Sequence, residues 1–237
     1  MLIYESIYRV PNMSDSSKKE CAVGYDRLMR LPIVLFTGFF FARELLNLGA
    51  LLARPPLNLD WHFICALAAR ISLLVFLGLL IFFHMIRSRP INKASGWEPK
   101  ISALLGLTLG NILLLLDRSA ASPMLDMAST ALLIAGNYLC VVVLLHLGRS
   151  ISIMAEARRL VTSGPYGVVR HPLYLAEQVA IVGIFLQFLS WQAALVLVVH
   201  FIFQIRRILN EERVLTETFP EYRDYANRTA RLIPGVW

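Results

Sequence analysis

The sequence contains apolar runs too long for an ordinary soluble fold. Four come first, at 31–53, 62–86, 101–116 and 124–147, and a fifth extends from 173 to 205. A helix that crosses the hydrocarbon core of a bilayer needs roughly 20 apolar residues, so each of the first four is near spanning length, although the third is short. The composition agrees, because 57% of the residues are hydrophobic and only 16% are charged. The sequence therefore predicts an all-α, polytopic membrane bundle of about five to six transmembrane helices.

The fifth run is too long for one crossing. As a single helix it would extend about 50 Å, against a hydrocarbon core of about 30 Å. We expect two helices folded into a hairpin near Ser190 and Trp191, and the alternative is one long, tilted helix that projects out of the membrane.

The distribution of basic residues favours the hairpin. Arginine and lysine gather in the cytoplasmic loops of membrane proteins. Here they precede the first run and follow the second, fourth and fifth, whereas the opposite loops hold only Arg54 and Arg118. An even number of crossings after Arg170 is then required, which a hairpin provides. Both the N-terminal tail and the C-terminal end are expected on the cytoplasmic side, with helices following the hairpin there.

This topology divides the chain into three parts. We expect a cytoplasmic tail at 1–30, four transmembrane helices within 31–147, and a functional region at 148–237 that includes the hairpin 173–205. The formal net charge of +7 is explained by orientation in the bilayer and by contact with anionic headgroups, so the expected partner is the lipid bilayer and no nucleic acid. The five histidines are scattered, and no metal site is expected.

Three ionisable residues, Arg43, Glu44 and Arg70, lie inside the first two apolar runs. A charge inside a membrane is costly unless it is paired or faces a cavity, so such residues are candidates for function. The alternative is a structural ion pair of Glu44 with Arg70 or Arg43. We favour the ion pair, because nothing else in these runs suggests a site.

Polar residues concentrate in two blocks that the predicted topology places on the same face of the membrane, 148–174 and 206–234. In the first block, Pro172 fits the first turn of a helix, whose free backbone N–H groups suit an anionic group. Arg170 and His171 precede it, flanked by Tyr166 and Tyr174. A purely interfacial role, with basic residues at headgroups and tyrosines in an aromatic belt, is the alternative.

In the second block, Arg207 and Glu211 are four residues apart and therefore share one helix face, while Glu212 lies on a neighbouring face. A surface ion pair is one interpretation. A buried version would let the carboxylate hold an ammonium or hydroxyl group of a cofactor while the guanidinium holds an anionic substrate.

Taken together, the two blocks resemble the isoprenylcysteine carboxyl methyltransferase family and its relatives among phospholipid methyltransferases. The likeness rests on Leu160-Val161-Thr162-Ser163-Gly164-Pro165-Tyr166, on Arg170-His171-Pro172-Leu173-Tyr174, and on Glu211-Glu212 with Leu215, Phe219, Tyr222, Tyr225 and Ile233-Pro234. The resemblance implies an integral membrane enzyme that binds S-adenosyl-L-methionine without a Rossmann domain and methylates a lipophilic or prenylated substrate from the bilayer. The cofactor-binding positions that it implies are Leu160, Val161, Tyr166, His171, Pro172, Leu173, Tyr174 and Glu211.

The resemblance also implies that Arg207 contacts the substrate, and we expect Arg170 to assist it. A carboxylate acceptor, such as a prenylcysteine-type group, needs no general base at neutral pH, so catalysis would consist mainly of positioning by Arg207. An amine acceptor, as in phospholipid N-methylation, would have to lose a proton, and Glu212 or Glu211 would be its base. We expect a carboxylate.

Two further alternatives remain open at this point. One is a nicotinamide-dependent membrane reductase of the sterol type, which shares the C-terminal architecture; the short helix count and the Glu211-Glu212 pair argue against it. The other is a membrane subunit or transporter without enzymatic activity, with Arg43, Glu44 and Arg70 as its pathway.

Overall fold

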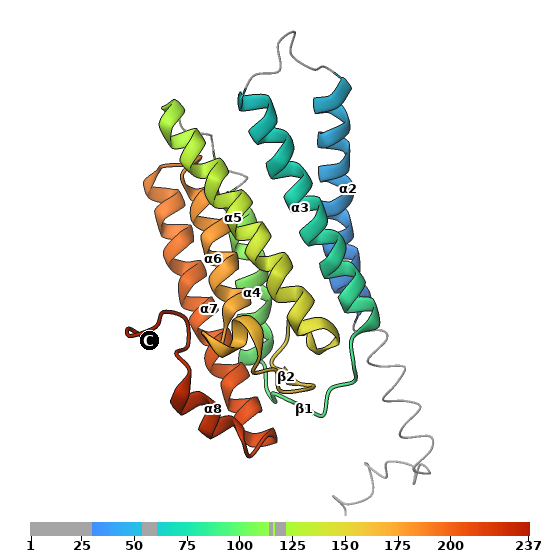
Figure 1. Cartoon of the computed structure of the whole chain (residues 1–237), viewed down its shortest axis with the longest axis vertical. Helices are drawn as coiled ribbons and strands as arrows, with labels where there is room; N and C mark the ends of the chain where they lie inside the picture. Colours follow the sequence, from blue (N-terminus) through green and yellow to red (C-terminus); the bar gives the residue numbers. More distant parts are fainter. Residues whose placement is uncertain (1–29, 54–60, 114–115, 117–121) are drawn as a thin grey trace, which may run out of the picture.

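The computed structural model describes residues 30–53, 61–113, 116 and 122–237, and all structural statements below concern these residues. The chain forms a helical bundle, which confirms the predicted fold class (Figure 1). Its helices are α2 (Leu31–Ala53), α3 (Trp61–Ile86), α4 (Glu98–Ile112), α5 (Pro123–Leu147), α6 (Pro172–Phe185), α7 (Trp191–Thr218) and α8 (Tyr222–Arg228). Between them lie the short 3-10 helices η2 (Gly148–Ser150) and η3 (Gly164–Gly167) and the strands β1 (Asn92–Lys93) and β2 (Glu156–Ala157).

Four of the described helices are long and apolar enough to cross a membrane: α2, α3, α5 continued by η2, and α7. Helix α6 is apolar but shorter. Helix α4, expected as a spanning helix at 101–116, begins earlier, at Glu98, and has 15 residues. The set fits a multi-pass membrane protein in which two short helices, α4 and α6, pack among longer ones.

The helices pack in a defined order. Helix α2 packs against α3, α3 against α5, and α5 against α6, while α4 packs against α7 (Figure 1). The polar segments, including α8 and the two strands, gather at one end of this bundle. The strands β1 and β2 pair antiparallel there, with Asn92 opposite Ala157, and so connect the loop after α3 to the segment after α5.

The predicted hairpin is confirmed as α6 followed by α7. Ser190 is the N-cap of α7, and its Oγ accepts a hydrogen bond from the backbone N–H of Ala193 at 3.1 Å. Caps of this kind satisfy one of the free N–H groups at a helix start. The second arm is longer than expected, because α7 continues past the end of the apolar run at 205 to Thr218. Arg207 and Glu211 are therefore on the same continuous helix as the membrane segment.

Basic residues meet at the end of the bundle that carries the polar segments. Arg30 donates from Nη1 to the carbonyl of Met85 at 2.6 Å, and Arg149 donates from Nε to the carbonyl of Ile86 at 2.9 Å. These bonds place the start of α2 and the ends of α3 and α5 together, as the distribution of basic residues in the sequence predicts. The rest of the expected tail, residues 1–29, and the opposite loops with Arg54 and Arg118 lie outside the described residues.

The ionisable residues of α2 and α3 form the predicted interhelical ion pair. Arg70 Nη1 lies 2.7 Å from Glu44 Oε1, and Asn47 Nδ2 donates to the other carboxylate oxygen at 3.1 Å. Arg43 lies over the ring of Phe40, 5.4 Å from its centroid. The pair accounts for Glu44 and Arg70 structurally, which removes the main reason for reading them as a transport pathway.

Helices α5 and α6 approach so closely that glycine is needed at the contact. A Cβ at position 136 would lie 2.6 Å from the backbone N of Ala180. Gly183 is similarly close to α5, and its carbonyl accepts a hydrogen bond from Ser129 Oγ at 2.7 Å. Small residues at such contacts let membrane helices pack through their backbones.

We expect Gly136→Ala to lower the free energy of unfolding by about 1 to 3 kcal/mol, because the new methyl group forces two backbones apart. Thermal unfolding of the detergent-purified protein measures the effect. Gly38→Ala, on α2, is the matched control because nothing lies within 4 Å of its Cβ position. Equal unfolding temperatures for the two variants would contradict this description of the α5–α6 contact.

Candidate functional site

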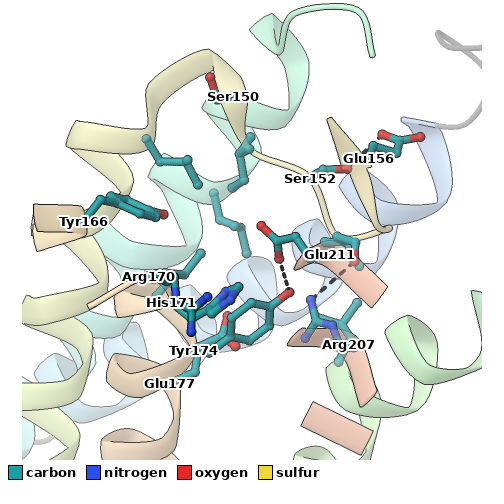
Figure 2. Close-up of a pocket in the computed structure, with 16 residues that line it drawn as sticks. Ser150, Ser152, Glu156, Tyr166, Arg170, His171, Tyr174, Glu177, Arg207 and Glu211 are labelled. Carbon is teal, nitrogen blue, oxygen red and sulfur yellow. Dashed lines mark hydrogen bonds between the residues drawn. The ribbon is translucent and has the colours of Figure 1, made fainter. Parts of the chain in front are cut away.

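A pocket opens where the segment after α5 meets the start of α6 and the polar part of α7 (Figure 2). It encloses about 660 Å³ of space between protein atoms, counting its open mouth. The lining residues are Leu80, Leu107, Leu147, Ser150, Ile151, Ser152, Ile153, Glu156, Tyr166, Arg170, His171, Leu173, Tyr174, Glu177, Arg207 and Glu211.

The pocket is amphipathic. Its leucines come from four helices: Leu80 from α3, Leu107 from α4, Leu147 from α5 and Leu173 from α6. Its charged side chains come from the segment after α5, from α6 and from α7. A molecule that has both a polar head and an apolar tail would find complementary walls on the two sides.

Tyr174 connects α6 to α7 at the centre of the pocket. Its hydroxyl donates to Glu211 Oε2 at 2.9 Å, and the guanidinium of Arg207 lies over its ring, 4.8 Å from the centroid (Figure 2). Pro172 starts α6, with His171 as its N-cap residue, so the proline fixes where the helix begins and where Tyr174 is directed.

Arg207 is almost completely buried, with 6% of its surface exposed. Nη1 donates to Gln204 Oε1 at 2.8 Å and Nη2 donates to the carbonyl of Ile153 at 3.4 Å. Its Nε has no hydrogen-bond partner in the described part of the chain. A buried donor without a partner is costly, so this guanidinium is suited to receive an acceptor group from a ligand.

Helix α4 packs directly against the side chain of Arg207. A Cβ at position 106 would lie 2.5 Å from Arg207 Cδ and 2.9 Å from Gln204 Oε1. Further along the same interface, Asn210 Nδ2 donates to Glu98 Oε2 at 2.8 Å and to Ser102 Oγ at 3.1 Å. Because Gly106 has no side chain, the Arg207 side chain can occupy the volume that a Cβ at position 106 would fill.

Glu212 does not line the pocket. Its Oε1 lies 3.1 Å from Arg170 Nη1 and 3.2 Å from His171 Nε2, and its Oε2 accepts from Arg231 Nε at 2.9 Å. Both oxygens are thus engaged by cationic or imidazole groups. The carboxylate joins α7 to the start of α6 and to the C-terminal segment.

The C-terminal segment adds backbone contacts to the same region. The N–H of Arg170 donates to the carbonyl of Ala230 at 2.7 Å, and the N–H of His171 donates to the carbonyl of Arg231 at 3.1 Å. These bonds fix the two residues that precede α6.

Two tyrosines link the pocket to α8: Tyr166 lines the pocket, and Tyr225 belongs to the helix. The hydroxyl of Tyr225 donates to the carbonyl of Tyr166 at 2.6 Å. Burial, with a contribution from the Glu211 carboxylate, raises the pKa of Tyr166 well above its usual range, and burial raises the pKa of Tyr225 to about 12. Both phenols therefore remain protonated at neutral pH, and the Tyr225 hydroxyl is a hydrogen-bond donor.

The structure brings most of the predicted site residues together. Tyr166, Arg170, His171, Leu173, Tyr174, Arg207 and Glu211 all line the pocket. Leu160, Val161, Pro172 and Glu212 do not. Leu160 and Val161 are partly exposed in the segment before η3.

Several lining residues were not predicted from the sequence, and Glu177 is the most informative. It is the one acidic residue in the run 173–205, and the rule that singled out Glu44 in an apolar helix could have found it. Glu156 was also missed; it pairs with Arg158 and accepts from Ser152 Oγ at 2.8 Å. Within the described ranges, no group of three or more His, Cys, Asp and Glu side chains is arranged to hold a metal ion.

Comparison with known proteins identifies the region that carries this pocket. The model of the family described as phospholipid methyltransferase matches residues 125–222, from α5 to the start of α8. This agrees, at the level of the broader family, with the resemblance seen in the sequence.

Two curated proteins are similar to part of the chain. The nickel-cobalt-cadmium resistance protein NccN of Alcaligenes xylosoxydans xylosoxydans is 37% identical over 82 residues, which cover 34% of this chain and 38% of that protein. The cobalt-zinc-cadmium resistance protein CzcN of Cupriavidus metallidurans is 37% identical over 78 residues, which cover 32% and 36%. The matched part spans little more than a third of each relative. Residues 125–222, which carry most of the polar side of the pocket, thus match the phospholipid methyltransferase family.

Proposed function

We propose that the protein is an S-adenosyl-L-methionine-dependent membrane methyltransferase that acts on a lipophilic acceptor. The observation that carries the proposal is an amphipathic pocket, with Tyr174, Arg207 and Glu211 at its polar centre, in the region that matches the methyltransferase family. We place this pocket at the cytoplasmic end of the bundle, because the basic residues gather at the same end.

The side chains of the pocket fit the chemical groups of the proposed cofactor. Glu211 offers a carboxylate to an ammonium group, and the buried Nε of Arg170 lacks a hydrogen-bond partner among the described residues. The rings of Tyr166 and Tyr174 and the imidazole of His171 offer surfaces for a nucleoside. When bound, S-adenosylmethionine would supply an electrophilic methyl group. The residues of the chain bind and orient the two reactants and exclude water.

For the acceptor, we propose that Arg207 holds an anionic group, with a prenylcysteine-type carboxylate as the first candidate. Its unpartnered Nε and its place between polar and apolar walls support this role. A carboxylate is already deprotonated at neutral pH, so positioning by Arg207 would be the main contribution of the protein to O-methylation. Arg170 is a weaker candidate for the same role, because its guanidinium is paired with Glu212.

N-methylation of a phospholipid amine is the second candidate. The geometry modifies the expected role of Glu212, whose two oxygens are bound by Arg170, His171 and Arg231. We propose that Glu212 is a positioning residue that fixes the start of α6, and that it is not a proton acceptor for the substrate.

Transfer of a labelled methyl group tests the proposed function. The purified protein is placed in nanodiscs made with a total membrane lipid extract, S-adenosyl-[methyl-³H]methionine is added, and label is counted in the organic phase. We expect time-dependent labelling that Glu211→Ala lowers about 30-fold at subsaturating cofactor, because a hydrogen bond to a charged group contributes about 2 kcal/mol. Glu217→Ala, an exposed carboxylate on the same helix, is the control and should retain the wild-type rate. Equal rates in both variants would contradict the role given to Glu211.

A further inference from the structure

We propose that the turn 232–237 is an interfacial anchor, whose apolar side chains enter the boundary between headgroups and acyl chains of the bilayer beside the start of α6. The starting point is a group of exposed apolar side chains outside the membrane helices. Ile233 is 51% exposed, Val236 is 77% exposed and Trp237 is 38% exposed. Neighbouring exposed apolar side chains of this kind mark contacts with a membrane or with another protein.

The turn is closed by its own backbone. The N–H groups of Leu232 and Ile233 both donate to the carbonyl of Trp237 at 3.1 Å, and the N–H groups of Val236 and Trp237 both donate to the carbonyl of Ile233 at 3.1 Å. Gly235, with a φ of +79°, provides the left-handed residue that this turn needs. Ile233 and Val236 are therefore presented by a defined structure.

Arg231 ties the turn to the rest of the protein. Its guanidinium lies over the ring of Trp237, 5.0 Å from the centroid, and its Nε donates to Glu212 Oε2 at 2.9 Å. The other oxygen of Glu212 contacts Arg170 and His171, which precede α6. The indole ring is thus linked through two side chains to the start of α6.

Backbone contacts set the level of the turn along the bundle. The N–H of His171 donates to the carbonyl of Arg231 at 3.1 Å, so the turn begins beside the start of α6. Helix α6 is apolar, and Val168, four residues before it, is an apolar side chain that is 65% exposed. We therefore place the membrane boundary near 168–172, which is also the level at which the turn leaves the bundle.

The direction of the turn agrees with this placement. Figure 1 shows the red end of the chain leaving α8 and turning up toward the apolar helices, so that it ends at the side of the bundle and not beyond α8. A tip that continued past α8 would meet water. A tip that projects sideways at the level where α6 begins meets the headgroups and the upper part of the acyl chains.

The residue types favour a bilayer as the partner. Tryptophan is enriched at the headgroup level of membranes, and Ile233 and Val236 suit the adjoining acyl layer. Arg231 retains 30% exposure of its side chain, which leaves part of its guanidinium for lipid phosphate. Three apolar side chains are too few for a stable protein–protein interface, which buries roughly 1,200–2,000 Å² in total.

Fluorescence of Trp237 tests the inference. The changes Trp61→Phe, Trp97→Phe and Trp191→Phe leave it as the single tryptophan. This protein is placed in nanodiscs of phosphatidylcholine that is brominated either near the headgroup end of its acyl chains or near their terminal methyls. We expect the first lipid to quench the emission at least about twofold more strongly than the second, and aqueous iodide to quench it weakly, because an interfacial ring lies roughly 5–10 Å deep.

Substitution at the tip completes the test. Val236→Glu in the same background should lower quenching by the first lipid about twofold or more and raise quenching by iodide, because a charge is costly in the acyl layer. Val236→Leu is the matched control and should retain the original quenching. If the single-tryptophan protein does not fold, the difference in emission between the wild type and Trp237→Phe in the same nanodiscs gives the contribution of Trp237.

Strong quenching by iodide without quenching by either lipid would place Trp237 in water and overturn the inference. Emission that is shielded from iodide and from both lipids would show that protein covers the turn, for example a second copy of the chain, and would overturn it as well. So would stronger quenching by the lipid brominated near the terminal methyls, or lipid quenching that Val236→Glu leaves unchanged. None of these measurements involves a cofactor, so their outcome is independent of the proposed function.

Discussion

Arg207→Gln is expected to lower the rate of methyl transfer by about three orders of magnitude while leaving the affinity for S-adenosylhomocysteine nearly unchanged. The guanidinium is the buried cation of the pocket that stacks on Tyr174 and retains an unpartnered Nε. Removing a single preorganised donor from an enzyme site commonly costs 10²–10³ in rate, and here a full charge is removed as well. Glutamine retains a polar group but cannot hold an anion with two parallel hydrogen bonds.

Arg213→Gln is the control for this variant, because Arg213 is exposed on the same helix. Initial rates and cofactor affinities of both variants are measured on the same nanodisc preparations. A rate within tenfold of wild type for Arg207→Gln would show that Arg207 does not hold the acceptor. A parallel loss of cofactor affinity would instead indicate that Arg207 contacts the cofactor.

Gly106→Ala is expected to lower the rate about 100-fold, although α4 belongs to the part of the chain that precedes the family match. The new Cβ would collide with Arg207 Cδ and with Gln204 Oε1, so the guanidinium has to move. A displacement of about 1 Å at a reacting group can cost about two orders of magnitude. We therefore regard Gly106 as a positioning residue that acts through Arg207.

The measurement has to separate displacement of Arg207 from general damage. We expect a raised KM for the acceptor and a lowered kcat, with the affinity for S-adenosylhomocysteine retained, because the new Cβ would meet Arg207 and Gln204, whereas the carboxylate that we propose for the cofactor is that of Glu211. Gly49→Ala is the matched control, with nothing within 4 Å of its Cβ position. An unchanged KM for the acceptor in Gly106→Ala would contradict a positioning role.

The membrane helices were predictable because their signal is local. Length and hydropathy of the run 31–53 predict α2, and the same properties with basic residues on both sides of 173–205 predict the hairpin. Hydropathy did not predict that α7 ends at Thr218. The last part of this helix is polar in sequence, and it is buried because other segments of the chain pack against it. Val214, for example, packs with Ala155 and Ala157 from the segment around β2.

The site was predictable in part, for a similar reason. Tyr174 and Glu211 belong to short motifs in the order that the resemblance requires, and the structure brings them within hydrogen-bonding distance. The contribution of Gly106 was not predictable, since it depends on how α4 packs against α7. The engagement of Glu212 by three partners depends likewise on the return of the C-terminal segment to the start of α6.

Calorimetric titration of S-adenosylhomocysteine into the wild-type protein, first in detergent and then in nanodiscs, tests the central claim most directly. It requires no knowledge of the acceptor. We predict saturable binding at one site per chain, weakened about 30-fold in Glu211→Ala and weakened clearly in His171→Ala, with Glu217→Ala equal to wild type. Absence of binding by folded wild-type protein in both environments would contradict the assignment of this pocket to a methyltransferase.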